Sequence, residues 1–130
     1  MRLKFDESLT TSSNKLSVEG WEEYWDEAEK LLDENWFNIT HQGYYLLASA
    51  ICICCLNGGY VRSLGGDIYE KLALKFKLKP ASVERNIRAA INFAKREAIR
   101  RKGGLMFDLV GATNGMIILK LANMILKKQA

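Results

Sequence analysis

The sequence predicts an all-α fold, a single-domain bundle of about six helices that contains a helix-turn-helix. Apolar residues recur at helical spacing along most of the chain, and no segment shows the alternation of apolar and polar residues that is typical of a strand. Glycine pairs separate the periodic segments. With 130 residues, of which 48% are hydrophobic, the chain can bury one core, so we expect one domain.

The N-terminal part divides into a tail and an acidic helix. We expect a flexible tail over residues 1–17, which are rich in Ser, Thr and Asn, and a helical domain over residues 18–130. The first helix should run from about Val18 to Asn35. Its inward side should consist of aromatic, alanine and leucine side chains, namely Trp21, Tyr24, Trp25, Ala28, Leu31 and Leu32.

The most apolar segment follows, a helix from about His41 to Leu56 with Thr40 as its N-cap. It is shorter than the roughly 20 residues that a membrane span needs, so we expect a buried helix and no membrane partner. A turn-rich segment from about Tyr60 to Leu64 comes next. The first residues of the chain turn acidic at once and show no signal peptide, so we expect a cytoplasmic protein.

Three cysteines, Cys52, Cys54 and Cys55, lie in the apolar helix. A metal or redox site is one interpretation, because Cys52 and Cys55 could share a helical face. The odd count, the apolar neighbours and a single histidine favour buried reduced thiols. We interpret that histidine, His41, as a helix-start residue, and the glycine pairs lack the strand and lysine of a phosphate-binding loop. We therefore expect no enzyme, no metal and no cofactor.

A helix-turn-helix is predicted over about residues 67–101. The first helix should begin at Asp67, a candidate N-cap with Glu70 three residues later as in a capping box. It carries Ile68, Leu72 and Phe76 on one face, and Ala73 is small enough for a second helix to approach. Residues 77–79 form a tight connector.

The second helix should begin with Pro80 in its first turn and end at Gly103 and Gly104. One stripe has the spacing of a core-facing side: Val83, Ile87, Ala90, Ile91, Ala94 and Ala98. The opposite side is basic, which in isolation indicates only a solvated surface. The helix that precedes it favours a different interpretation, in which the second helix is a recognition helix. A recognition helix contacts base edges with residues near its N-terminus. The outward-facing residues at that position are Ser82, Arg85, Arg88 and Ala89.

The charge distribution agrees with a nucleic-acid partner. Residues 1–40 hold four basic and ten acidic side chains, whereas residues 41–130 hold fifteen basic and five acidic ones. A segregated positive field attracts phosphate backbones and makes binding salt-dependent. Beyond the basic helix, a glycine-punctuated stretch leads to a last helix from about Asn114 to Lys128, with Thr113 as its candidate cap.

The segment IYEKLALKFKLKPASVERNIRAAINFA resembles the helix-turn-helix of the C-terminal effector domain of the stage 0 sporulation response regulator, the master regulator of endospore formation in Firmicutes. ITHQGYYLL resembles the family's upstream helix start, and TNGMIILKLANMILK resembles its final helix. The similarity covers roughly Leu31 to Leu126 in the same order. Its most specific element is the run from Val83 to Ile91.

The resemblance implies a helical bundle that binds a short promoter element, often as tandem head-to-tail copies, and that contacts RNA polymerase sigma factor. It assigns base and phosphate contacts to Glu84, Arg85 and Arg88. A family arginine position is occupied by Ser82 and a family histidine position by Ala89, so the reading face carries less charge. The family's receiver domain has no counterpart here, so we expect no phospho-aspartate switch. The segment before the last helix is also shorter than in the family.

We therefore predict sequence-specific binding to duplex DNA and transcriptional regulation of the sporulation type. The expected base-reading residues are Ser82, Glu84, Arg85, Arg88 and Ala89, with Glu84 accepting from an exocyclic amine or orienting an arginine. The expected phosphate contacts are Lys79, Asn92 and Arg96. The alternative is a protein-interaction module that keeps the fold, has weakened or lost sequence-specific DNA binding, and uses the Trp-rich acidic helix as its partner surface.

The acidic helix itself has two possible roles. It can cap the bundle through its aromatic side, away from the reading face, or it can fold over Arg85 and Arg88 and inhibit binding. We favour the cap, because the aromatic side chains need an apolar partner that the arginine face does not offer.

Overall fold

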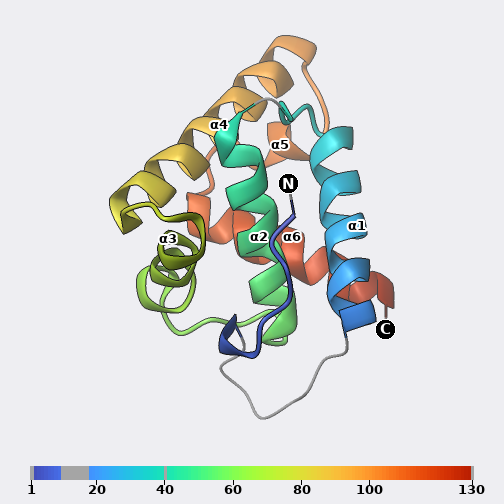
Figure 1. Ribbon diagram of the computed structural model, residues 1–130. Coiled ribbons are helices and arrows are strands. Elements are labelled where there is room, and N and C mark those ends of the chain that lie inside the picture. Colours follow the sequence, from blue (N-terminus) through green and yellow to red (C-terminus); the bar gives the residue numbers. More distant parts are fainter. Residues whose placement is uncertain (1, 10–17, 40, 130) are drawn as a thin grey trace.

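The structure, a computed structural model, describes residues 2–9, 18–39 and 41–129. Within these ranges it contains helices and no strand, as the sequence predicts. A 3-10 turn, Glu7–Leu9, precedes the bundle, and a π-helical turn, Gly65–Tyr69, leads directly into α3. The α-helices are α1 (Val18–Glu34), α2 (Gln42–Leu56), α3 (Glu70–Phe76), α4 (Pro80–Arg101), α5 (Leu105–Asp108) and α6 (Asn114–Gln129) (Figure 1).

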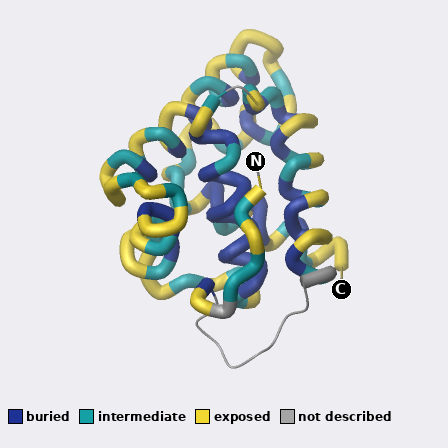
Figure 2. Tube along the Cα trace, viewed as in Figure 1, coloured by how far each residue is buried: buried dark blue, intermediate teal, exposed yellow. Residues whose placement is uncertain are grey.

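Helix α2 is the centre of the fold. Helices α1, α4 and α6 pack around it (Figure 1), and its residues from Gly43 to Leu56 are buried except for Tyr45 (Figure 2). A helix that is apolar on all sides needs such cover from several neighbours. The expected burial of the helix is therefore confirmed. None of the helices in the described ranges is long and apolar enough to span a membrane.

The three cysteines of α2 are buried and unpaired, as predicted. Burial raises the pKa of the Cys54 thiol to about 11 and raises the pKa values of Cys52 and Cys55 well above the ordinary range. Thiols in that state are poor nucleophiles and poor metal ligands. His41 is the N-cap of α2, with extended backbone angles and no capping side-chain bond, whereas the expected cap Thr40 lies outside the described residues.

Helix α1 packs its aromatic side on α2 and α6. Trp21, Trp25, Ala28 and Leu32 are fully buried, and Leu31 is half-buried. The helix ends at Glu34, one residue earlier than expected.

Residues 2–9, here called the N-terminal strap, differ from the flexible tail that we expected over residues 1–17. The strap lies across the front of the bundle in Figure 1, between α1 and α3. Leu9 is fully buried in the core, and the indole Nε1 of Trp21 donates to the Leu3 carbonyl at 2.8 Å. Residues 10–17 lie outside the described residues. The strap is attached by contacts with residues distant in sequence, which a local composition argument does not detect.

The start of the first helix of the helix-turn-helix differs from the prediction. Asp67 is not an N-cap, because the helical run begins before it. The capping pair lies one turn earlier: the Ser63 hydroxyl accepts from the Gly66 N–H at 3.3 Å, and the Ser63 N–H donates to the Asp67 carboxylate at 3.2 Å. The reciprocal logic of a capping box is kept, with Ser63 as the cap.

The observed ends of α4 and α6 agree more closely with those predicted from the sequence. Pro80 occupies the first turn of α4, as predicted. At the other end Lys102, and not a glycine, takes the left-handed conformation with φ 57°, and the Gly103 N–H donates back to the Ala98 carbonyl at 3.2 Å. Thr113 caps α6, as predicted, by accepting from the Met116 N–H at 3.2 Å.

Candidate nucleic-acid interface

The turn between α3 and α4 is built without glycine. Lys77 adopts the left-handed conformation, φ 57° and ψ 48°, and the Leu78 N–H donates to the Ala73 carbonyl at 2.8 Å. This satisfies a carbonyl at the end of α3 and reverses the chain direction. Lys79 is then the extended N-cap of α4, and its carbonyl accepts from the Val83 N–H at 3.1 Å.

The crossing of the two helices is apolar and closed to solvent. Leu72 of α3 and Val83 and Ile87 of α4 are fully buried, and Ala73 is 5% exposed. Helices α3 and α4 pack on each other and on α2. This packing fixes the rotation of α4 about its own axis, and therefore decides which of its side chains face outward.

The outward side of α4 is a basic strip. Arg85, Arg88, Asn92 and Arg96 are exposed, and their spacing of three or four residues places them along one side of the helix. The other residues expected at the interface lie at or beside this strip: Lys79 and Ala89 are exposed, and Ser82 and Glu84 are half-buried. The structure thus brings all eight expected residues to the surface of one helix and its N-cap. Their roles towards DNA stay predictions.

Two contacts orient the arginines near the start of α4. The Arg88 Nη1 donates to the Glu84 Oε1 at 2.8 Å, and the Arg85 Nη2 donates to the Ser82 hydroxyl at 3.4 Å. Tyr69 lies beside the first pair: burial and then the Glu84 carboxylate raise the pKa of its hydroxyl. Glu84 therefore orients an arginine in the free protein, one of the two roles that we expected for it.

The C-terminal half of α4 has basic residues that are already paired. Glu97 accepts from Arg100 Nη2 at 2.8 Å and from Arg101 Nε at 3.3 Å, and the Arg100 hydrogen bond lowers the pKa of its carboxyl. The Arg101 guanidinium also lies over the Trp36 ring at 5.1 Å. These pairs are not among the sequence-based expectations, although their spacing of three and four residues is the local signal for them. Arg96 forms no ion pair with the described residues and is available to a phosphate.

The acidic helix does not cover the basic strip. Helix α1 packs on α2 and α6, while Arg85 and Arg88 are exposed. The predicted cap position is thereby confirmed. Because Trp21 and Trp25 are fully buried, they do not offer the aromatic partner surface that the alternative function required.

No group of three or more His, Cys, Asp or Glu side chains suited to a metal ion occurs among the described residues. A family model described as sporulation initiation factor Spo0A C terminal matches residues 29–125. The match includes α2 to α5, and therefore the complete helix-turn-helix, and most of α6, but it excludes the strap and most of α1. No curated protein and no solved structure matches the chain.

Proposed function

Because the chain belongs to the family of Spo0A C-terminal domains of sporulation initiation factors, we propose that it binds duplex DNA sequence-specifically through α4 and regulates transcription. The family is one of helical, non-enzymatic domains that generally bind DNA for transcription control. The observation that carries the finer proposal is the exposed basic strip on α4. Its side chains project from a helix held in place by the buried crossing of Leu72 and Ile87.

The two ends of the strip have different roles in this proposal. Arg85 and Arg88 lie near the N-terminus of α4, where a recognition helix contacts base edges in the major groove. Arginine can donate two hydrogen bonds to the two acceptors of one guanine. Ser82, Glu84 and Ala89 complete the reading surface, with Glu84 orienting Arg88 or accepting from an exocyclic amine. Lys79, Asn92 and Arg96 contact phosphates, which contribute affinity without sequence information.

The proposal extends to partners beyond DNA. The family resemblance supports head-to-tail copies on DNA, contact with RNA polymerase sigma factor, a cytoplasmic location and a role in sporulation-type control in Firmicutes. In this chain the segment between α4 and α6 exposes Phe107 and Val110, and Met116 is 60% exposed close by. These apolar side chains support a protein contact at that end of the molecule.

Selection of bound sequences from a random duplex library tests the proposal. We expect one discrete motif, with binding that weakens steeply as salt rises because phosphate contacts release counterions. Arg85→Ala and Arg88→Ala should each cost about 1–3 kcal/mol of binding free energy on the selected site and much less on random DNA. Arg96→Ala should weaken binding to both DNAs equally.

A matched control separates local contacts from general charge. Lys127→Ala removes one exposed cation from the end of α6 that meets α1, where the neighbouring Lys128 pairs with Glu27 at 2.9 Å. It should leave the sequence preference unchanged. If the selection recovers no motif, and if Arg85→Ala and Lys127→Ala lose the same amount of DNA affinity, the results would instead favour the protein-interaction alternative.

A further inference from the structure

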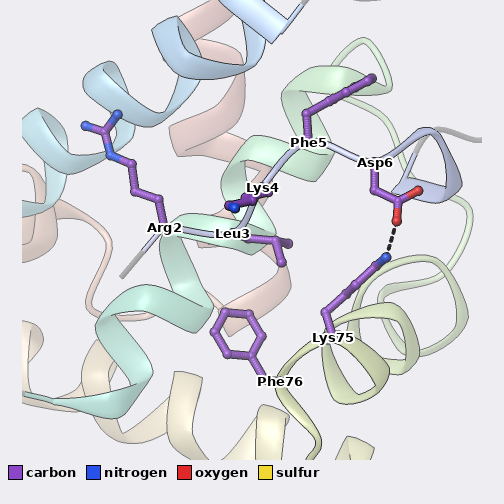
Figure 3. Close-up of a pocket in the computed structure, with 7 residues that line it drawn as sticks. All are labelled: Arg2, Leu3, Lys4, Phe5, Asp6, Lys75 and Phe76. Atoms are coloured by element: carbon purple, nitrogen blue, oxygen red, sulfur yellow. Dashed lines mark hydrogen bonds and ion pairs between the residues drawn. The ribbon is translucent and has the colours of Figure 1, made fainter.

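The N-terminal strap lies outside the family match and joins two parts of the molecule that do not follow each other in sequence. Figure 3 shows the strap running beside α3, with Asp6 directed towards Lys75 and Arg2 directed the opposite way. The strap therefore has one attachment on the acidic helix and another on the first helix of the helix-turn-helix.

The attachment to α1 consists of several contacts. The Arg2 guanidinium donates to Glu22 at 2.9 Å, to Asp26 at 2.7 Å and to Glu29 at 2.6 Å. It also lies over the Trp25 ring, 5.8 Å from the ring centroid. The three carboxylates recur along one side of α1 and repel one another without a cation between them. Arg2 thus stabilises both the strap and the helix on which it lies.

The middle of the strap covers one tryptophan. The Trp21 indole donates to the Leu3 carbonyl at 2.8 Å, and the Phe5 ring meets the Trp21 ring edge-on with centroids 6.0 Å apart. Trp21 and Trp25 are both fully buried while the strap is in place. The two indoles are therefore reporters of strap closure.

The attachment to α3 depends on one ion pair. Asp6 pairs with Lys75, while an open cavity of about 300 Å³ separates the strap from the end of α3. Leu3 and Phe76 face each other across this cavity (Figure 3). Apolar packing does not fill the gap, so the charge pair is the main direct tie between strap and α3. Beyond it, Leu9 anchors the strap in the core.

We propose that the strap is a latch: closure at Arg2 places Asp6 next to Lys75, and this contact holds α3, and with it α4, in a fixed position relative to α1. A single exposed ion pair contributes little, but one guanidinium shared by three carboxylates is a network. Strap closure should therefore depend mainly on Arg2 and weaken as salt screens these exposed charges. The effect on DNA binding rests on the proposed function; the effects on the strap and α3 do not.

Arg2→Gln in the full chain tests the latch, with Lys4→Gln as its matched control. Lys4 is exposed, lies on the same strap and forms no ion pair with the described residues, so its loss removes the same charge from the same segment. In Arg2→Gln we expect about twofold stronger acrylamide quenching of tryptophan fluorescence and about threefold faster amide hydrogen exchange in α3. The DNA affinity of Arg2→Gln should be at least about threefold lower than that of Lys4→Gln. Trp36 lies against Arg101 and not under the strap, so its fluorescence should be quenched equally in all variants.

A second variant isolates the far attachment. Lys75→Gln should speed amide exchange in α3 while leaving tryptophan quenching as in the wild type, because Arg2 still closes the strap. Normal quenching and normal α3 exchange in Arg2→Gln would overturn the latch, as would an unchanged α3 in Lys75→Gln. If Arg2→Gln opens the strap but binds DNA like Lys4→Gln, the coupling to DNA binding is wrong. A wild type that binds no duplex contradicts the proposed function, and the quenching and exchange results then still decide the latch.

Discussion

Gly43→Ala should destabilise the protein, because α2 and α4 approach each other at this residue with no room for a side chain. A Cβ on Gly43 would lie 2.0 Å from the Asn86 carbonyl oxygen, 2.7 Å from its carbon and 3.0 Å from the Ala90 Cβ. Carbon atoms in contact are normally about 3.5–4.0 Å apart, so the helices would have to separate by about 1 Å. Asn86 lies inside the long helix α4, whose backbone cannot move locally.

Two opposing effects determine how much Gly43→Ala changes the free energy of unfolding. Overpacking of a close-packed interface costs about 1–3 kcal/mol, and Gly→Ala in a helix gains at most about 1 kcal/mol from propensity. The gain is smaller at Gly43, because the residue lies in the first turn of α2. We therefore expect a net loss of about 1–2 kcal/mol, which corresponds to a lowering of Tm by roughly 4–8 °C.

Thermal unfolding followed by far-UV circular dichroism measures the change, and Gly65→Ala is the matched control. Gly65 also lies in the first turn of a helical segment, but its Cβ would meet only the Ser63 hydroxyl, at 3.8 Å. This variant should be as stable as the wild type or up to about 1 kcal/mol more stable. If α4 is the recognition helix, as we propose, DNA affinity should also fall in Gly43→Ala, since Asn86 and Ala90 belong to α4. A Gly43→Ala protein with wild-type Tm would refute the reasoning.

Ile87→Ala and Leu72→Ala should each cost about 2–5 kcal/mol of unfolding free energy in denaturant titrations, because both side chains are fully buried; an unchanged midpoint contradicts the packing of the helix-turn-helix. Deleting residues 1–35 should give an unstable or aggregating protein, since the tryptophans of α1 leave the core, and a soluble fragment that binds DNA more tightly would contradict the cap. The Lys75 hydrogen bond, followed by that from the Ser8 N–H, lowers the pKa of Asp6 to about 2 from an ordinary value of 3.8. Its contribution to the attachment of α3 should therefore be complete above about pH 4 and lost as the pH falls through about 2; the difference in α3 amide exchange between wild type and Asp6→Asn, followed against pH, measures this, and identical acid profiles would contradict it. The three thiols should react with a thiol reagent at neutral pH only after unfolding, because burial raises their pKa values, and rapid labelling of the native protein would argue against their burial.

The position of the candidate site followed from the sequence because its determinants are local. The stripe Val83, Ile87, Ala90, Ile91, Ala94 and Ala98 is fully or almost fully buried, and an apolar stripe at helical spacing determines which side of a helix meets a core. Once that stripe is fixed, Arg85, Arg88 and Arg96 must face the opposite way. The N-terminal proline of α4, the Thr113 cap and the burial of α2 are predictable for the same reason.

Local signals located the helix ends less accurately. Asp67 followed by Glu70 has the spacing of a capping box, but Ser63 provides a competing cap one turn earlier, and the π-helical turn extends the helix towards it. Lys77 and Lys102 adopt the left-handed conformation without being glycine. A chain reversal imposed by packing can override the modest cost of that conformation for a lysine.

The sequence by itself determined the all-α class, the helix-turn-helix and the basic side of its second helix, because periodicity and charge are properties of contiguous residues. Only the tertiary structure decided that Arg2 joins Glu22, Asp26 and Glu29, that Asp6 reaches Lys75, 69 residues away, and that Gly43 touches the backbone of α4. These contacts exist because packing brings distant segments together. An ion pair or a close backbone approach has no period in the sequence, since it depends on the spatial arrangement of elements and not on the order of residues within one.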